Sequence, residues 1–98
     1  MTITMNRNGK ELTVALEGRL DTRTSPELEA KLEPEFEGTD KLIFDLADLR
    51  YISSAGLRVL LSSMQIMEEQ GELIVRNVRP EIMDIFEVTG FSEDLNIE

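Results

Sequence analysis

The sequence predicts a single α/β domain, a two-layer sandwich in which three helices cover one face of a mixed sheet of four or five strands. The first observation is a pair of alternating apolar segments joined by Asn8-Gly9, which is typical of a β-hairpin. The second is that strand-like and helix-like patterns then alternate three times, which favours parallel strands joined by right-handed helical crossovers. The third is the length of 98 residues, enough for one domain and too short for two.

The predicted hairpin opens the chain. We expect Asn8 and Gly9 to form a type I′ turn, in which both central residues adopt positive φ. Strict alternation also predicts that one face of this part of the sheet is exposed to water. The apolar positions of the two arms are Ile3, Met5, Leu12, Val14 and Leu16.

The first helix is predicted to begin at residues 24–27, Thr-Ser-Pro-Glu, with a hydroxyl side chain as its cap and a proline in its first turn. Pro34 removes a backbone donor and clashes one turn back, so we expect the helix to end or kink near Glu33. Its apolar stripe is Leu28, Leu32 and Phe36. Its glutamates are interpreted as a solvated face rather than a metal site, because no constrained loop holds them: Glu27, Glu29, Glu33, Glu35 and Glu37.

The rest of the chain supplies the remaining strands and helices. We predict a central strand at 41–46, a connector, a helix that begins at 53–56 and stops at Gly71, a strand at 72–77 and a helix from Pro80 to Gly90. Leu95 and Ile97 could form a short last strand. The residues expected to be buried in the sheet include Ile3, Val14, Leu16, Phe44 and Val75.

Composition excludes several classes of function. The chain has no cysteine and no histidine, which removes thiol catalysis, cysteine-ligated zinc and the usual base of a serine nucleophile. Its formal net charge of −10 argues against binding to nucleic acid or to an anionic membrane. No apolar run is long enough to span a bilayer, and we expect no secretory signal, so a cytoplasmic location is expected.

Polar residues that could form a site gather at the carboxyl edge of the predicted sheet, where sites of such folds usually lie. Segments 19–24, 47–54 and 77–79 are predicted to meet there, with Asp21, Asp45, Asp48, Ser53 and Ser54 as their polar residues. No phosphate-binding glycine loop follows any strand, which leaves nucleotide hydrolysis without support. The hairpin after the first strand argues against an aspartate-phosphorylated receiver domain. We therefore expect no enzyme activity, no cofactor and no metal.

Residues 45–57, Asp-Leu-Ala-Asp-Leu-Arg-Tyr-Ile-Ser-Ser-Ala-Gly-Leu, form the most distinctive segment. They resemble the signature of bacterial anti-sigma factor antagonists, the STAS domains. Residues 18–28 are similar to the family pattern Gly-x-Leu-Asp-x-x-Thr-x-x-x-Leu, and Gly71 and Gly90 fall where family glycines do. The resemblance covers essentially the whole chain and implies one STAS domain over residues 1–98.

The resemblance implies a switch protein and not an enzyme. Unphosphorylated, such a protein binds an anti-sigma factor that is also a serine kinase, and so frees the sigma factor for transcription. Phosphorylation releases it, and a serine phosphatase restores it. We expect a monomer. The alternative is a STAS-type scaffold or sensor module that binds a small ligand or a protein without being phosphorylated.

Alignment on the signature places Ser54 at the phosphoacceptor position, with Ser53, where the family usually has aspartate, as the second choice. By position alone Ser54 is expected to be a helix N-cap or a first-turn residue, since serine is common there, and the motif match favours the phosphoacceptor role. The two roles are compatible, because a helix N-terminus stabilises a phosphate and Arg58 lies one turn on to pair with it. The residues expected to contact the partner are Asp21, Thr24, Ser53, Ser54, Gly56 and Arg58.

Overall fold

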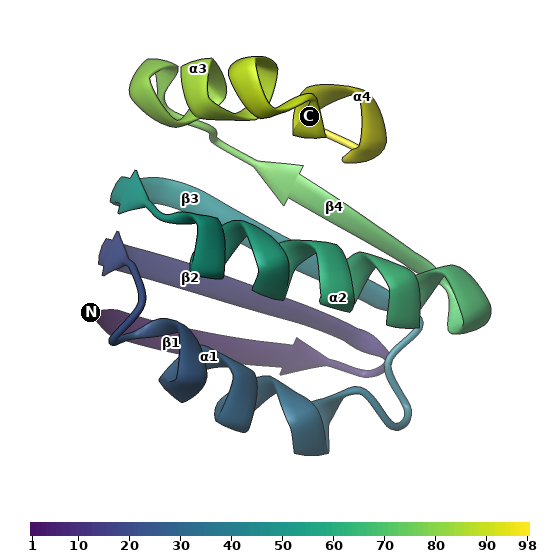
Figure 1. Ribbon diagram of the computed structural model, residues 1–98. Coiled ribbons are helices and arrows are strands. Elements are labelled where there is room, and N and C mark those ends of the chain that lie inside the picture. The colour runs from purple at the N-terminus through teal and green to yellow at the C-terminus, as the bar shows by residue number, and fades with distance from the viewer.

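A computed structural model describes all 98 residues and contains one four-stranded sheet in the order β1-β2-β3-β4 (Figure 1). The hairpin strands β1 and β2 are antiparallel, whereas β2, β3 and β4 are parallel, so the mixed sheet is confirmed. The elements are β1 (Thr2–Asn8), β2 (Glu11–Leu20), α1 (Ser25–Leu32), the 3-10 turn η1 (Glu33–Glu35), β3 (Lys41–Ile52), α2 (Ser54–Gln70), β4 (Glu72–Arg76), α3 (Pro80–Thr89) and α4 (Phe91–Asp94). No helix is long and apolar enough to cross a membrane.

A single hydrophobic core joins the sheet to the helices. Leu28 of α1, Leu60 of α2 and Phe86 of α3 belong to one cluster with Phe44 of β3, which supports the prediction that the three main helices cover one face. Figure 1 shows α1 and α2 crossing the same face of the sheet and α3 beyond β4. Of the predicted buried residues, Val14, Leu16, Phe44 and Val75 are confirmed. Ile3 is only half-buried because β1 is an edge strand.

The hairpin turn is displaced by one residue from the predicted turn. Asn8 still pairs with Glu11, so the two loop residues are Gly9 and Lys10. Gly9 has φ of 65°, and neither Asn8 nor Lys10 has positive φ. Positive φ at the first loop position alone is the type II′ pattern, so the expected type I′ turn is wrong. The hairpin and its two-residue loop are as expected.

Strand β3 is twice the predicted length, because residues 47–52 continue the strand instead of forming a connector. Two register shifts occur against β2, one between Ala15 and Glu17 and one between Gly18 and Arg19, and β3 supplies the extra residue each time. Such bulges let Leu46, Leu49 and Ile52, three residues apart, all face the core.

The boundaries of the helices follow the predicted signals at three points. α1 ends at Leu32 and passes into η1, which contains Pro34, as predicted. α2 stops before Gly71, and α3 stops before Gly90, which has φ of 82°. The predicted last strand is reduced to a single parallel bridge between Ile97 and Val75, and the short helix α4 before it was not expected.

Candidate functional site

The N-terminus of α2 is capped by Ser53 and not by Ser54. Ser53 has extended backbone angles, φ −94° and ψ 175°, and its Oγ accepts a hydrogen bond of 3.3 Å from the Gly56 amide. Helix geometry begins at Ser54, which is therefore the first helical residue. The interpretation of Ser54 as a plain N-cap is wrong, because Ser53 occupies that position and satisfies the amide that a cap normally serves.

Ser54 is exposed, and its hydroxyl forms no hydrogen bond within the protein. The amides of Ser54 and Ala55 have no partner within the helix, since the first N–H groups of any helix precede the intrahelical ladder. Arg58, four residues on, is also exposed and forms no ion pair. An accessible hydroxyl therefore stands next to unpartnered donors and an unpaired cation. This arrangement can accept an anion, and it offers no base for nucleophilic catalysis.

Gly56 holds the start of α2 against the end of β2. It is buried, and a Cβ at this position would lie 2.8 Å from the Leu20 Cγ and 2.8 Å from the Ile52 Cγ1. The Ser53 amide donates a hydrogen bond of 2.9 Å to the Leu20 carbonyl at the same junction. Gly56 could have been a partner contact or a residue that packs the helix start on the sheet, and its burial favours the packing role, which sets the position of Ser54.

The loop between β2 and α1 is fixed by Asp21. Its Oδ1 accepts hydrogen bonds from the amides of Arg23 at 3.0 Å and Thr24 at 3.1 Å. These bonds, the Thr24 amide first, hold the pKa of Asp21 below its ordinary value of 3.8. The Thr24 hydroxyl donates to the Arg19 carbonyl at 2.8 Å and caps no helix amide, so the predicted hydroxyl cap is wrong.

A cation–aromatic pair that the sequence analysis missed lies beside this loop. The Arg19 guanidinium sits 4.2 Å from the centre of the Tyr51 ring and 3.8 Å from an Asp21 carboxylate oxygen. Arg19 and Tyr51 are paired across β2 and β3 only because of the bulges in β3. Tyr51 is 37% exposed, one of three large apolar side chains on the surface. Arginine and tyrosine are enriched at protein interfaces.

The predicted polar residues divide into two groups. Ser53 and Gly56 meet Leu20 directly, so the α2 N-terminus and the Asp21 loop share one edge as expected. Asp45 and Asp48 lie elsewhere, because β3 runs on for several residues beyond them and they line a small hollow on the opposite sheet face with Thr4 and Glu17. Asn77 and Arg79 meet that part of β3 instead, through Asp45 Oδ1 at 3.1 Å and the Ala47 carbonyl at 3.3 Å.

The acidic side chains form no metal site. Nowhere in the structure do three aspartate or glutamate side chains gather closely enough to hold a metal ion. The candidate site therefore consists of the α2 N-terminus, the Asp21 loop and the Arg19–Tyr51 pair.

Comparisons with known proteins cover nearly the full chain. The model of the STAS domain family matches residues 2–98. BtrV of Bordetella bronchiseptica, a candidate anti-sigma factor antagonist, is 38% identical over 93 residues, which is 93% of this chain and 80% of BtrV. The anti-sigma-B factor antagonist of Bacillus subtilis is 27% identical over 97% of this chain and 88% of its own length.

Solved structures share the fold. The anti-sigma factor antagonist SpoIIAA in its unphosphorylated form superposes with a TM-score of 0.80 at 18% identity, covering 99% of this chain and 87% of SpoIIAA. The phosphorylated form of SpoIIAA from Bacillus gives a TM-score of 0.79 at 19% identity, with coverage of 99% and 91%. At such identities the likeness establishes the arrangement of strands and helices.

Proposed function

The chain belongs to the STAS domain family, and on that premise we propose that it is an anti-sigma factor antagonist that phosphorylation of Ser54 switches off. In its unphosphorylated form it binds an anti-sigma factor with serine kinase activity and so releases the sigma factor. The partner then phosphorylates Ser54 and dissociates, and a serine phosphatase resets this cytoplasmic switch. The names of the sequence relatives support the antagonist role, and the existence of a phosphorylated SpoIIAA supports a switch of this kind.

The exposure of Ser54 is the observation that favours Ser54 over Ser53 as the phosphorylated residue. A kinase needs a hydroxyl that it can reach, and the Ser54 hydroxyl is on the surface with no partner to give up. Ser53 is half-buried, and its hydroxyl already accepts from the Gly56 amide. Phosphorylation of Ser53 would sacrifice the cap of α2, whereas phosphorylation of Ser54 leaves that cap intact.

The fold tolerates a phosphate at Ser54, which is a condition for a reversible switch. A phosphoserine carries about −1.5 to −2 charges. The N-terminus of α2 carries partial positive charge, and Arg58 stands four residues on, where it can pair with the phosphate. The free energy of unfolding therefore changes little on phosphorylation.

Phosphorylation does, in contrast, change the surface that the partner contacts, because negative charge replaces the neutral Ser54 hydroxyl. An interface formed with that hydroxyl loses affinity unless the partner opposes it with unpaired basic groups. Asp21, Thr24 and Arg58 flank the serine and complete the proposed contact surface. Arg19 and Tyr51 add an exposed cation–aromatic pair to it, a type of side chain that often dominates binding energy.

A comparative pull-down from lysate of the source bacterium tests this function. Immobilised wild-type protein and the Ser54→Ala variant are expected to retain an anti-sigma factor with serine kinase activity, identified by mass spectrometry, whereas Ser54→Asp does not. The matched control is Gln65→Glu, which adds the same charge to an exposed position three turns further along α2. Equal retention by Ser54→Asp and wild type contradicts the charge switch and favours the unphosphorylated scaffold.

A further inference from the structure

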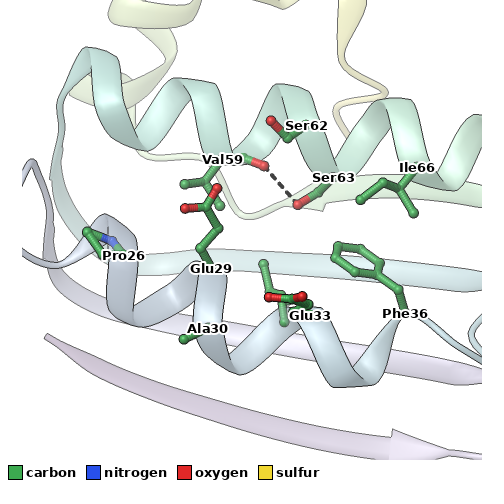
Figure 2. Close-up of a pocket in the computed structure, with 10 residues that line it drawn as sticks. Pro26, Glu29, Ala30, Glu33, Phe36, Val59, Ser62, Ser63 and Ile66 are labelled. Atoms are coloured by element: carbon green, nitrogen blue, oxygen red, sulfur yellow. Dashed lines mark hydrogen bonds between the residues drawn. The ribbon is translucent and has the colours of Figure 1, made fainter.

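A groove between α1 and α2 runs away from the α2 N-terminus along the surface of the helical layer (Figure 2). Its larger part, about 470 Å³, lies between Glu29, Glu33 and Phe36 on the α1 side and Val59, Ser62 and Ile66 on α2. A second hollow of about 270 Å³ continues it past Ala55 and Arg58, and the two share Pro26, Glu29, Val59 and Ser62. The groove therefore ends beside the first turn of α2, at Ala55, the residue that follows Ser54.

Small side chains keep this groove open. Ala30 on α1 and Ser62 on α2 are too short to bridge the space between the helices, and both are exposed. Ser63 is buried, and its hydroxyl donates a hydrogen bond of 2.8 Å to the Val59 carbonyl of its own helix, drawn as a dashed line in Figure 2. Its polar atom is thus satisfied, and the groove wall at this point has no free donor.

The groove combines apolar surface with unneutralised negative charge. Ile66 is 39% exposed and lies near Phe36 at one end of the space, as Figure 2 shows. Glu29 and Glu33 are four residues apart on the α1 side, both exposed, and neither forms an ion pair. An occupant that fits must therefore present an apolar stripe and positive charge together.

We propose that this groove docks a basic amphipathic helix of a protein partner. Such a helix lays its apolar face on Phe36 and Ile66 and brings lysine or arginine to Glu29 and Glu33. This deepens the proposed function by naming the chemistry of the partner segment, since the groove leads to Ser54. A fatty acid is less favoured, because its carboxylate would meet Glu29 and Glu33 in the larger part of the groove and only Arg58 in the smaller part could oppose its charge. A second copy fits poorly because this chain has a net charge of −10 and no basic amphipathic helix of its own.

The test measures fluorescence anisotropy of a labelled 18-residue peptide of leucine and lysine, with leucines at helical spacing. Such a helix is about 27 Å long, comparable to α2. The full-length wild-type protein is expected to bind this peptide and not its leucine–glutamate counterpart. Glu29→Lys with Glu33→Lys is expected to weaken binding about tenfold or more, and Ile66→Ser about fivefold. If the lysine pair impairs folding, Glu29→Gln with Glu33→Gln replaces it, with a smaller loss expected.

Matched controls separate the groove from general charge attraction. Glu87→Lys with Glu93→Lys makes the same charge change on exposed positions of α3 and α4, which lie at the β4 edge of the sheet, away from α1 (Figure 1), and Val88→Ser removes an exposed apolar side chain there. Both controls are expected to change binding less than about twofold.

Four results overturn the proposal: failure of the wild-type protein to bind the leucine–lysine peptide, equal weakening by the two charge-reversed pairs, displacement of the peptide by laurate, or a dimer of the free protein that Ile66→Ser dissociates. No kinase takes part in this assay. Failure of the peptide to bind therefore leaves the phosphorylation of Ser54 standing, and absence of phosphate on Ser54 leaves the groove standing.

Discussion

Gly56 in the first turn of α2 lies directly against Leu20, the last residue of β2, so closely that a Cβ on Gly56 would stand 2.8 Å from the Leu20 Cγ and 2.9 Å from its carbonyl oxygen. Real side chains do not pack at this distance, and the carbonyl belongs to a strand that cannot easily move. The contact fixes the height of α2 above the sheet and hence the position of the two serines that precede Gly56.

Gly56→Ala is therefore expected to lower the free energy of unfolding by about 1–3 kcal/mol, the usual cost of overpacking a tight core contact. Chemical denaturation measures this change. The control is Ser62→Ala, an exposed position of the same helix, which is expected to alter stability by less than about 0.5 kcal/mol. A Gly56→Ala variant as stable as the control would show that Leu20 can move away from the added methyl group at little cost in free energy.

The two neighbouring serines are expected to differ in their contribution to stability. Ser53→Ala removes the hydroxyl that accepts from the Gly56 amide and should cost about 1 kcal/mol. Ser54→Ala removes a hydroxyl without a partner and should cost less than about 0.5 kcal/mol. Thermal denaturation of both variants gives the comparison. The reverse order would show that Ser54, and not Ser53, caps α2.

Ser54→Asp is expected to fold at least as stably as Ser54→Ala, because a carboxylate at the first position of a helix interacts favourably with the helix dipole. The gain should be about 0.3–1 kcal/mol. Ser62→Asp places the same charge away from the helix start and should gain nothing. Calorimetry of the three variants decides the matter, and a Ser54→Asp melting temperature well below that of Ser54→Ala would contradict the tolerance for charge at this site.

Asp21 is expected to make stability depend on pH in the acid range. Its folded pKa lies below the ordinary 3.8, so the stabilisation is present above that value and is lost as pH falls through the folded pKa. Asp21→Asn should therefore melt below wild type at pH 7, with the difference shrinking as pH falls below 3.8. Glu87→Gln, an exposed residue without partners, is the control. A difference in melting temperature that is independent of pH would show that the loop does not depend on the carboxylate charge.

Most of the fold could be predicted from the sequence because its strands and helices follow regular periods. The alternation in β1 and β2, the stripe of α1 and the glycines after α2 and α3 are local signals, and each of them placed its element correctly. The turn lies one residue later than predicted because Gly9 fits two loop types: the second position of a type I′ loop formed by Asn8 and Gly9, or the first position of a type II′ loop formed by Gly9 and Lys10. The register of the two strands pairs Asn8 with Glu11 and so selects the second loop.

The second half of β3 could not be predicted because its bulges change the spacing between successive buried residues from two positions to three. Residues 47–52 look like an irregular connector in the sequence. Two of them, Leu49 and Ile52, are nevertheless buried, as is Leu46 before them. The same bulges align Tyr51 with Arg19, so the contact between these two side chains could not be predicted from periodic patterns in the sequence. Asp45 and Asp48 were placed at the wrong edge for the same reason, since the strand was predicted to end at Leu46, whereas it runs on to Ile52.

The assignment of the cap was wrong by one residue for a different reason. Ser53 and Ser54 are identical in chemistry, and only backbone angles separate the cap from the first helical residue. The two serines therefore differ clearly in role: Ser53 caps α2, and Ser54 keeps an exposed hydroxyl.

Phosphopeptide mapping of the protein isolated from its own bacterium tests the central claim most directly. Wild-type protein and the Ser53→Ala variant are expected to carry phosphate on Ser54, and the Ser54→Ala variant is expected to carry none at either position. Phosphate on Ser53 of the wild-type protein, or protein that stays unphosphorylated while bound to its kinase partner in the presence of ATP, would contradict the account.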